Sequence, residues 1–187
     1  MTSVTELPPD LPRPVDDGAC DHLPGLAMPS VRLPSTAGRL VDLGALSAPR
    51  TVIYCYPRTG RPGEALPDGW DTIPGARGCT PQACAFRDHH VELADLGAEV
   101  YGLSTQTTDY QREMAQRLHL PFEVLSDARF ALIEALRLPT FQAEGMRLVK
   151  RLTLIVREQR IEHVFYPVFP PNKSADQVLD WLERHPI

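Results

Sequence analysis

The chain has 187 residues, of which 43% are hydrophobic and 23% charged, and its formal net charge is −5. This length favours one domain with a sizeable core. The negative net charge and the lack of a basic run argue against nucleic acid or an anionic membrane as the main partner. No apolar stretch approaches the roughly 18 residues that span a bilayer, so membrane insertion is not expected.

The N-terminal segment is rich in proline and acidic residues. Residues 1–17 contain four prolines and lack the apolar stretch of a secretory signal. We therefore expect residues 1–23 to form a mobile arm and residues 24–187 to form a single domain. The missing signal favours a cytoplasmic protein, in which cysteines stay reduced unless they are catalytic or redox-sensing.

Periodicity along the rest of the chain predicts alternating strands and helices. Strands are expected at residues 31–33, 39–43, 51–56, 98–104, 122–125, 152–156 and 161–165, and helices at 81–96, 108–119, 129–136 and 175–184. The continuous apolar run at 51–56 is typical of a buried central strand. Ser174 is the expected cap of the last helix, with Gln177 completing a capping box. This order predicts an α/β fold with a mixed central sheet flanked by helices.

The longest stretch without periodicity is residues 58–78, between the central strand and the first helix. It holds five glycines and three prolines, which argue against regular structure. Loops of this length are usually functional or disordered. Arg58, Arg61 and Arg77 are expected to be solvated loop charges, unless one of them lines the entrance to a site, for which Arg77 is the candidate.

The four cysteines are too few for a disulfide framework, so chemistry is the better interpretation of the close pair Cys79 and Cys84. Cys55 lies in the central strand and is expected to be a core thiol. Cys20 lies in the arm and is expected to be incidental.

Cys79 lies where a helix is expected to begin, with Thr80 as its N-cap and Pro81 at its first position. The positive end of a helix dipole stabilises a thiolate over a thiol. Cys79 is therefore a candidate nucleophile, and Cys84 is a second thiol five residues later.

Residues 78–88 combine these two cysteines with a following Phe-Arg-Asp tail. This segment, preceded by Tyr-Pro at 56–57, resembles the active-site motif of the peroxiredoxin Q group, also called bacterioferritin comigratory proteins. Further stretches match that group in the same order, at residues 101–105, 120–127, 151–156 and 161–164. The resemblance covers about residue 24 to the end of the chain.

The resemblance implies a thioredoxin-like fold and the reduction of hydrogen peroxide or organic hydroperoxides. Cys79 would be the peroxidatic cysteine and Cys84 the resolving one. Arg151 would hold the thiolate and the peroxide oxygens, since a guanidinium offers several donors in a fork. Attack would give a sulfenic acid on Cys79, which condenses with a thiol to a disulfide. A dithiol such as thioredoxin would restore the enzyme, a monomer or weak homodimer, without a metal or organic cofactor.

The substrate oxygen is expected to meet the backbone N–H groups of the first helical turn, with Arg77, Gly78 and Thr80 as substrate-binding candidates. The chain departs from the family here, because Ala76 stands where the family has a threonine whose hydroxyl helps to bind the peroxide. The preceding segment is also longer by about fifteen residues, and Arg77 replaces a proline. Thr72 and Thr80 are candidates for the missing hydroxyl.

The spacing of Cys79 and Cys84 has a geometric consequence. In an intact helix, positions i and i+5 differ by about 140° and 7.5 Å of rise, which separates their Cα atoms by roughly 8–9 Å. A disulfide requires Cα atoms closer than about 7 Å. The first turns of this helix are therefore expected to unwind before the two cysteines can bond.

Two other functions remain open on the sequence. One is a disulfide oxidoreductase acting on protein thiols, although such enzymes usually carry Cys-x-x-Cys. The other is a peroxide sensor that is oxidised once, with little turnover; the alanine at position 76 and the long loop leave this possible. The adjacent His89 and His90 match no standard zinc pattern, so no metal site is expected.

Overall fold

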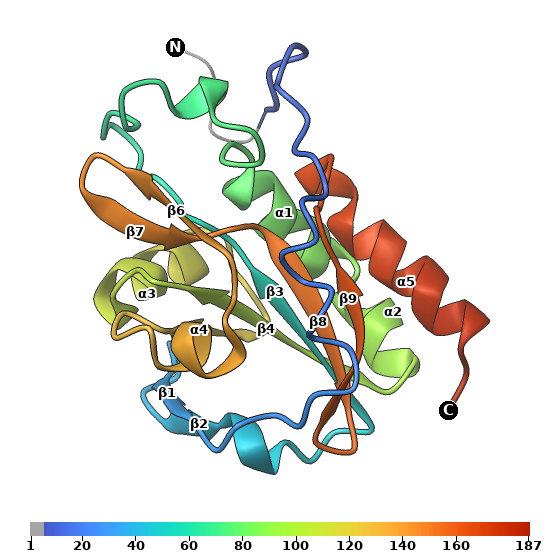
Figure 1. Ribbon diagram of the computed structural model, residues 1–187. Coiled ribbons are helices and arrows are strands. Elements are labelled where there is room, and N and C mark those ends of the chain that lie inside the picture. The colour runs from blue at the N-terminus through green and yellow to red at the C-terminus, as the bar shows by residue number, and fades with distance from the viewer. Residues whose placement is uncertain (1–5) are drawn as a thin grey trace.

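A five-stranded mixed sheet forms the centre of the structure, a computed structural model that describes residues 6–187 (Figure 1). In spatial order its strands are β5 (Glu123–Ser126), β4 (Ala98–Ser104), β3 (Arg50–Cys55), β8 (Leu152–Arg157) and β9 (Arg160–Phe165). β3 pairs in parallel with β4 and antiparallel with β8. All six residues of β3 are buried, which confirms the central strand expected from the apolar run.

Helices cover both faces of this sheet. They are α1 (Cys79–Asp88), α2 (His90–Asp95), α3 (Thr108–Arg117), α4 (Ala131–Leu136) and α5 (Ser174–Arg184). Val52 and Tyr54 of β3 point into the core shared with α1, α2, α3 and α5, whereas Ile53 and Cys55 point into the core shared with α4. This alternation along one strand produces the two hydrophobic layers of the predicted α/β fold.

The helix expected at residues 81–96 is two helices. It begins at Cys79, two residues earlier than expected, and is interrupted at His89, whose φ and ψ are −100° and 13°. The imidazole of His89 contacts the carboxylate of Glu92 on α2 and, at 2.9 Å, that of Asp176 on α5. The bend between α1 and α2 is thus fastened to α5, which the helical periodicity alone did not reveal.

A hairpin that the sequence did not predict packs beside the long loop. Its strands are β6 (Thr140–Ala143) and β7 (Met146–Val149), joined by Glu144 and Gly145 with φ of 46° and 74°. Trp70 from the loop packs with Leu148 from the hairpin in a separate small core. Residues 58–78 are therefore anchored by a hydrophobic cluster of their own. They include one short regular element, a 3-10 helix at Trp70–Thr72.

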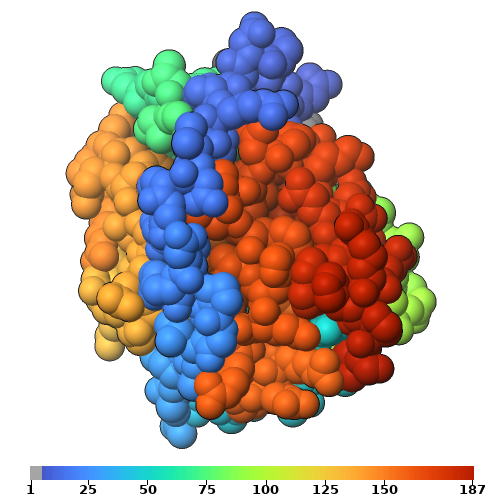
Figure 2. All heavy atoms as spheres, turned by 45° about the vertical axis from the view of Figure 1, so that its right-hand side comes forward, coloured from blue at the N-terminus to red at the C-terminus, as the bar shows by residue number. Residues whose placement is uncertain are grey.

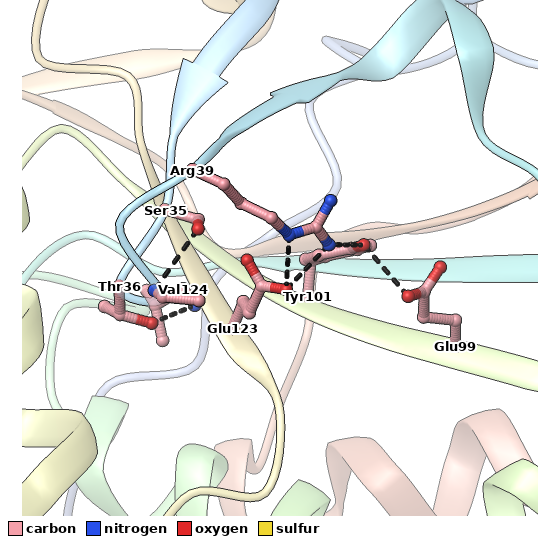
Figure 3. Close-up of polar contacts among 8 residues, drawn as sticks. Ser35, Thr36, Arg39, Glu99, Tyr101, Glu123 and Val124 are labelled. Carbon is pink, nitrogen blue, oxygen red and sulfur yellow. Dashed lines mark hydrogen bonds and ion pairs between the residues drawn. The ribbon is translucent and has the colours of Figure 1, made fainter.

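A second hairpin, β1 (Arg32–Pro34) and β2 (Leu40–Asp42), is fastened to the sheet by polar contacts (Figure 3). The guanidinium of Arg39 donates to Glu123 at 2.7 and 2.9 Å and to the hydroxyl of Tyr101 at 3.2 Å. The Tyr101 hydroxyl donates in turn to Glu99 at 2.9 Å. Burial and the hydrogen bond to Glu99 raise the pKa of Tyr101 to about 12. Tyr101 therefore remains a neutral donor in this network at physiological pH.

Part of the N-terminal segment expected to be a mobile arm packs against the domain, and its mobility stays a prediction. The segment drawn in blue in Figure 2 runs along the C-terminal hairpin, where residues 25–28 exchange backbone hydrogen bonds with residues 159–161. Asp17 accepts hydrogen bonds from Lys150 at 3.0 Å and from Tyr166 at 2.8 Å. Cys20 and Leu23 belong to the main core, so Cys20 is not incidental, and burial raises its pKa to about 12. Prolines prevent helix and strand formation in this segment, but they do not prevent extended packing.

The cap expected for the last helix is also wrong. α5 begins at Ser174 itself, and its flanking residue Lys173 makes no side-chain capping bond. The Ser174 hydroxyl instead accepts a hydrogen bond from Nε2 of Gln82 at 3.1 Å. The Ser174 side chain therefore forms a tertiary contact with α1 and does not cap its own helix.

The pH dependence of stability tests the contact between the α1–α2 bend and α5. The hydrogen bond to Glu92, supported by Asp176, raises the pKa of His89. A raised pKa in the folded state stabilises the fold at pH values below the unfolded pKa of about 6.5, and this contribution is lost as pH rises through the folded value. We expect His89→Gln to lower the free energy of unfolding more at pH 5.5 than at pH 9, measured by urea denaturation. An equal loss at both values would contradict this role.

Candidate active site

The first turn of α1 presents Cys79 at a constrained backbone position. Gly78 is the N-cap with φ of 105°, a left-handed conformation that favours glycine, and Cys79 is the first helical residue. A Cβ on Gly78 would lie 2.4 Å from Pro171 and 2.8 Å from Leu7. The predicted cap Thr80 is instead the second helical residue. Gly78 thus lets the chain turn tightly enough to place the sulfur at the positive end of the helix dipole.

The sulfur of Cys79 is buried between a carbonyl and a guanidinium. Its side chain donates to the carbonyl of Ala76 at 3.7 Å, and Nη2 of Arg151 donates to the sulfur at 3.1 Å. The residue is 4% exposed and Arg151 is 3% exposed. A cation this close in a site with little water stabilises negative charge on sulfur. The structure therefore brings together the predicted nucleophile and the predicted arginine from segments 72 residues apart.

Arg151 is held from every side of its guanidinium. Its Nε donates to the carbonyl of Gly75 at 3.2 Å, and Nη2 donates to the carbonyls of Ala76 and Arg77 at 3.0 and 3.2 Å. Its Nη1 donates to Oε1 of Gln82. These acceptors satisfy a charge that would otherwise be costly to bury. They also fix the end of the long loop and the second half of the first helical turn around one cation.

A small pocket of about 20 Å³ opens beside the thiol. Its lining residues are Arg58, Thr59, Gly60, Leu66, Trp70, Arg77, Gly78, Cys79 and Thr80. This volume holds about one water molecule. The three residues predicted to bind substrate therefore lie around the same pocket as the nucleophile, although their role in binding stays a prediction.

Arg77 is not the solvated loop charge that its surroundings in sequence suggest. It is 7% exposed, and its Nη1 contacts Asp71 at 3.0 Å. The small core between the loop and the β6–β7 hairpin encloses this part of the loop, so the charge is paired within the protein. That core was not predicted, and neither was the burial of Arg77.

The hydroxyl groups divide into those at the pocket and those away from it. Thr72 is exposed and donates to the carbonyl of Gly69 at 2.6 Å, whereas Thr80 is buried and lines the pocket. Thr59 also lines it and is missing from the sequence prediction. Both the N–H and the carbonyl of Thr59 bond the side-chain amide of Gln106, each at 3.0 Å.

A topological signal was available for Thr59 and Gln106. Each follows the carboxyl end of a buried strand, β3 and β4, and these strands are neighbours in parallel. Carboxyl ends of neighbouring parallel strands meet at one edge of the sheet, where α/β folds place their sites. The sequence gives no such signal for Gln82, because a polar residue within a helix is common and does not by itself indicate a site.

Cys84 lies on the same helix but outside this pocket. Both cysteines are free thiols, and α1 is continuous from Cys79 through Cys84. Partial burial raises the pKa of Cys84, which the nearby Arg87 opposes. The helix therefore holds the pair apart, with Cys84 favoured as a neutral thiol.

Comparison with known proteins finds the same family along most of the chain. The model of the Redoxin family matches residues 23–179. Peroxiredoxin Bcp of Escherichia coli K12 is 29% identical over 161 residues, covering 84% of this chain and 93% of that protein. Chloroplastic peroxiredoxin Q of Sedum lineare is 28% identical over 159 residues, covering 85% of this chain and 77% of that protein.

The fold comparison agrees. The crystal structure of peroxidoxin BcpB from Mycobacterium tuberculosis is similar with a TM-score of 0.72 and 25% identity, covering 89% of this chain and all of that one. Within residues 6–187, no helix has the length and apolar character required to cross a membrane. The same residues contain no group of three or more His, Cys, Asp or Glu side chains placed to hold a metal ion.

The burial of Gln82 predicts a cost in stability when its side chain is removed. Its amide accepts from Arg151 and donates to Ser174, and it is fully buried. Gln82→Ala leaves a buried guanidinium N–H without its partner, and we expect a loss of about 2–3 kcal/mol in the free energy of unfolding, measured by urea denaturation. Gln116→Ala, at an exposed position on α3, is the matched control with an expected change within about 0.5 kcal/mol. Equal effects of the two changes would refute the role given to Gln82.

Proposed function

The chain belongs to the Redoxin family and, within it, to the peroxiredoxin Q group, and we propose that Cys79 is the cysteine through which it reduces hydroperoxides. A peroxiredoxin is a thiol peroxidase. The observation that carries the assignment to Cys79 is the 3.1 Å contact between its sulfur and Nη2 of Arg151, at the first residue of a helix. This family assignment also argues against the disulfide oxidoreductase that the sequence left open.

The reaction begins with attack of the Cys79 thiolate on one peroxide oxygen. An S–O bond forms, the O–O bond breaks, and the leaving oxygen takes a proton to depart as water or an alcohol. The product is a sulfenic acid on Cys79. Arg151 stabilises negative charge first on sulfur and then on the departing oxygen, and the N–H groups of the first turn of α1 face the same pocket.

Cys84 is the resolving cysteine in this proposal. Its thiol loses a proton and attacks the sulfur of the sulfenic acid, which releases water and forms a Cys79–Cys84 disulfide. The two residues are five apart on a continuous helix, so the first turn must unwind for the bond to form. Phe86 stacks on Tyr54 at 4.5 Å between ring centroids and keeps the second half of α1 on the sheet. The moving part is thus the turn from Cys79 to Gln82.

An external dithiol of the thioredoxin type supplies two electrons and returns both cysteines to thiols. The proposed substrates are hydrogen peroxide and organic hydroperoxides, and Arg77, Gly78 and Thr80 are the proposed contacts to the bound peroxide. The volume of about 20 Å³ beside Cys79 favours hydrogen peroxide over bulky hydroperoxides. The cytoplasmic location and the monomeric or weakly dimeric state remain predictions from sequence.

Single cysteine substitutions test this assignment. We expect Cys79→Ser to abolish hydrogen peroxide consumption in the presence of thioredoxin, thioredoxin reductase and NADPH, because serine is not oxidised. Cys84→Ser should still be oxidised once at Cys79, seen by mass spectrometry as a sulfenic acid, but should lose the intramolecular disulfide. Cys55→Ala, a change at a buried thiol in the other core layer, is the control and should keep turnover.

Two outcomes would contradict the proposal. A Cys79→Ser protein as active as the wild type would place the chemistry elsewhere. Slow oxidation of the wild type by one equivalent of peroxide, without recycling by thioredoxin, would favour a peroxide sensor over an enzyme.

A further inference from the structure

The roof of the Cys79 pocket comes from one short segment, residues 58–66, which we call the flap. Arg58, Thr59, Gly60 and Leu66 from the flap all line the pocket, facing Cys79 and Thr80 from α1. Since this space holds about one water molecule, a bulky organic hydroperoxide reaches the sulfur only if residues that line the pocket move.

The flap is attached differently from the rest of the long loop. Leu66, at the end of the flap, and the following residues to 76 are anchored in the small apolar core with the β6–β7 hairpin, where Trp70 contacts Phe141 at 6.1 Å between ring centroids. The flap is held by hydrogen bonds and ring contacts to residues at and near α3. Gly60 accepts from Arg117 at 3.3 Å, and Gly63 has φ of 82°, a conformation that favours glycine. Polar attachments beside glycines break more easily than a packed core.

Tyr110, in the first turn of α3, contacts several residues of this segment. The guanidinium carbons of Arg61 and Arg58 lie 4.2 and 6.0 Å from the centroid of its ring. Its hydroxyl donates to Oε2 of Glu64 at 2.8 Å. Nε of Arg61 is buried and has no hydrogen-bond partner among residues 6–187, and the ring face of Tyr110 lies against this guanidinium. One side chain of α3 thus fastens three residues of the flap.

The flap also borders a larger pocket through Arg58. This groove of about 360 Å³ is lined by Arg58 and Tyr110 together with Phe130, Met146 and Leu148. Arg58 belongs to the walls of both spaces, and the pair Thr59 and Gln106 lies between them. Release of Arg58 and Arg61 from Tyr110 would join the pocket at Cys79 to a space large enough for an organic group.

We propose that Tyr110 is a specificity-determining residue, which holds the flap over Cys79 and thereby restricts the reaction to small hydroperoxides. It acts as a positioning residue, since it touches the flap and lies outside the pocket at the sulfur. The inference rests on the proposed function in one respect, namely that Cys79 is the sulfur that meets the peroxide.

The test compares small and bulky peroxides on matched variants. The variants are Tyr110→Ala, Tyr110→Phe, Arg61→Gln and, as a control on the same helix, Arg112→Ala. Arg112 is partly exposed and pairs with Asp109, away from the flap. Oxidation of Cys79 by hydrogen peroxide and by cumene hydroperoxide is followed by stopped flow, with Trp70 in the pocket wall as the fluorescent reporter.

We expect Tyr110→Ala to raise the ratio of kcat/KM for cumene hydroperoxide to that for hydrogen peroxide by about tenfold, a typical effect of steric exclusion. The gain should appear as a lower KM for the bulky substrate, with the hydrogen peroxide rate within about twofold of wild type, because the groups at the sulfur are unchanged. Tyr110→Phe keeps the ring and should change the ratio less, whereas Arg61→Gln should follow Tyr110→Ala. Equal ratios in Tyr110→Ala, Arg61→Gln and Arg112→Ala would overturn the proposal.

A second measurement separates this inference from the proposed function. Alkylation of Cys79 by iodoacetamide and by N-(1-pyrenyl)maleimide is followed by peptide mass spectrometry, which needs no peroxidase activity. A preference shifted toward the bulky reagent in Tyr110→Ala supports the flap even if the wild type fails to reduce peroxide. An unchanged preference, in a variant with the wild-type unfolding midpoint, overturns the flap while leaving the proposed function intact. If Tyr110→Ala does not fold, Arg61→Gln gives the same two readouts.

Discussion

The buried guanidinium of Arg151 is the constraint on which the active-site region depends. A cation that is 3% exposed needs acceptors for its N–H groups, and each of its three nitrogens finds at least one, from the end of the long loop, from Gln82 or from the sulfur of Cys79. Because β8 begins at the next residue, the central sheet fixes where this cation lies. The nucleophile, the first turn of α1 and the loop that ends at Gly78 are then arranged around it. The contacts of Arg151 that stabilise this region are therefore also the contacts that position the proposed catalytic groups.

That arrangement sets up a competition within one helical turn. The contacts between Cys79 and Arg151 would favour the proposed attack on a peroxide, whereas the proposed disulfide with Cys84 would require the same turn to unwind. The two ends of α1 are held by different contacts. Phe86, in the second half of the helix, stacks on Tyr54, whereas the first turn is held mainly through Gln82 and the close packing of Gly78 against Pro171. In the proposed reaction, conversion of a Cys79 thiolate to a neutral sulfenic acid would weaken the contact with Arg151, which would favour release of the turn at the stage when resolution needs it.

The parts of the fold carried by local patterns were predictable, and the parts carried by tertiary packing were not. The apolar run of β3 identified the central strand, and the motif and the family resemblance selected Cys79 and Arg151, which the structure brings into contact. The bend at His89 was not predicted because the two helices that it joins share one hydrophobic stripe. The contact that holds the bend is made with α5, which is distant in the sequence. The small core around Trp70 joins residues about 75 apart and leaves no periodic trace in the loop. Thr59 and Gln106 were missed because their relation depends on two parallel strands ending side by side.

The polar contacts of the β1–β2 hairpin also determine how this sheet meets other molecules. β5 and β9 are its outer strands, and each would present unpaired backbone groups to a neighbouring chain. Thr36 donates its N–H to the carbonyl of Val124 beside the Arg39–Glu123 ion pair, and residues 25–28 exchange backbone hydrogen bonds with residues 159–161 along β9. Backbone groups of both outer strands are thus paired in part by the chain's own N-terminal third. A strand from a second copy would have to displace these contacts before it could pair there, so the packed N-terminal third protects the sheet against edge-to-edge association.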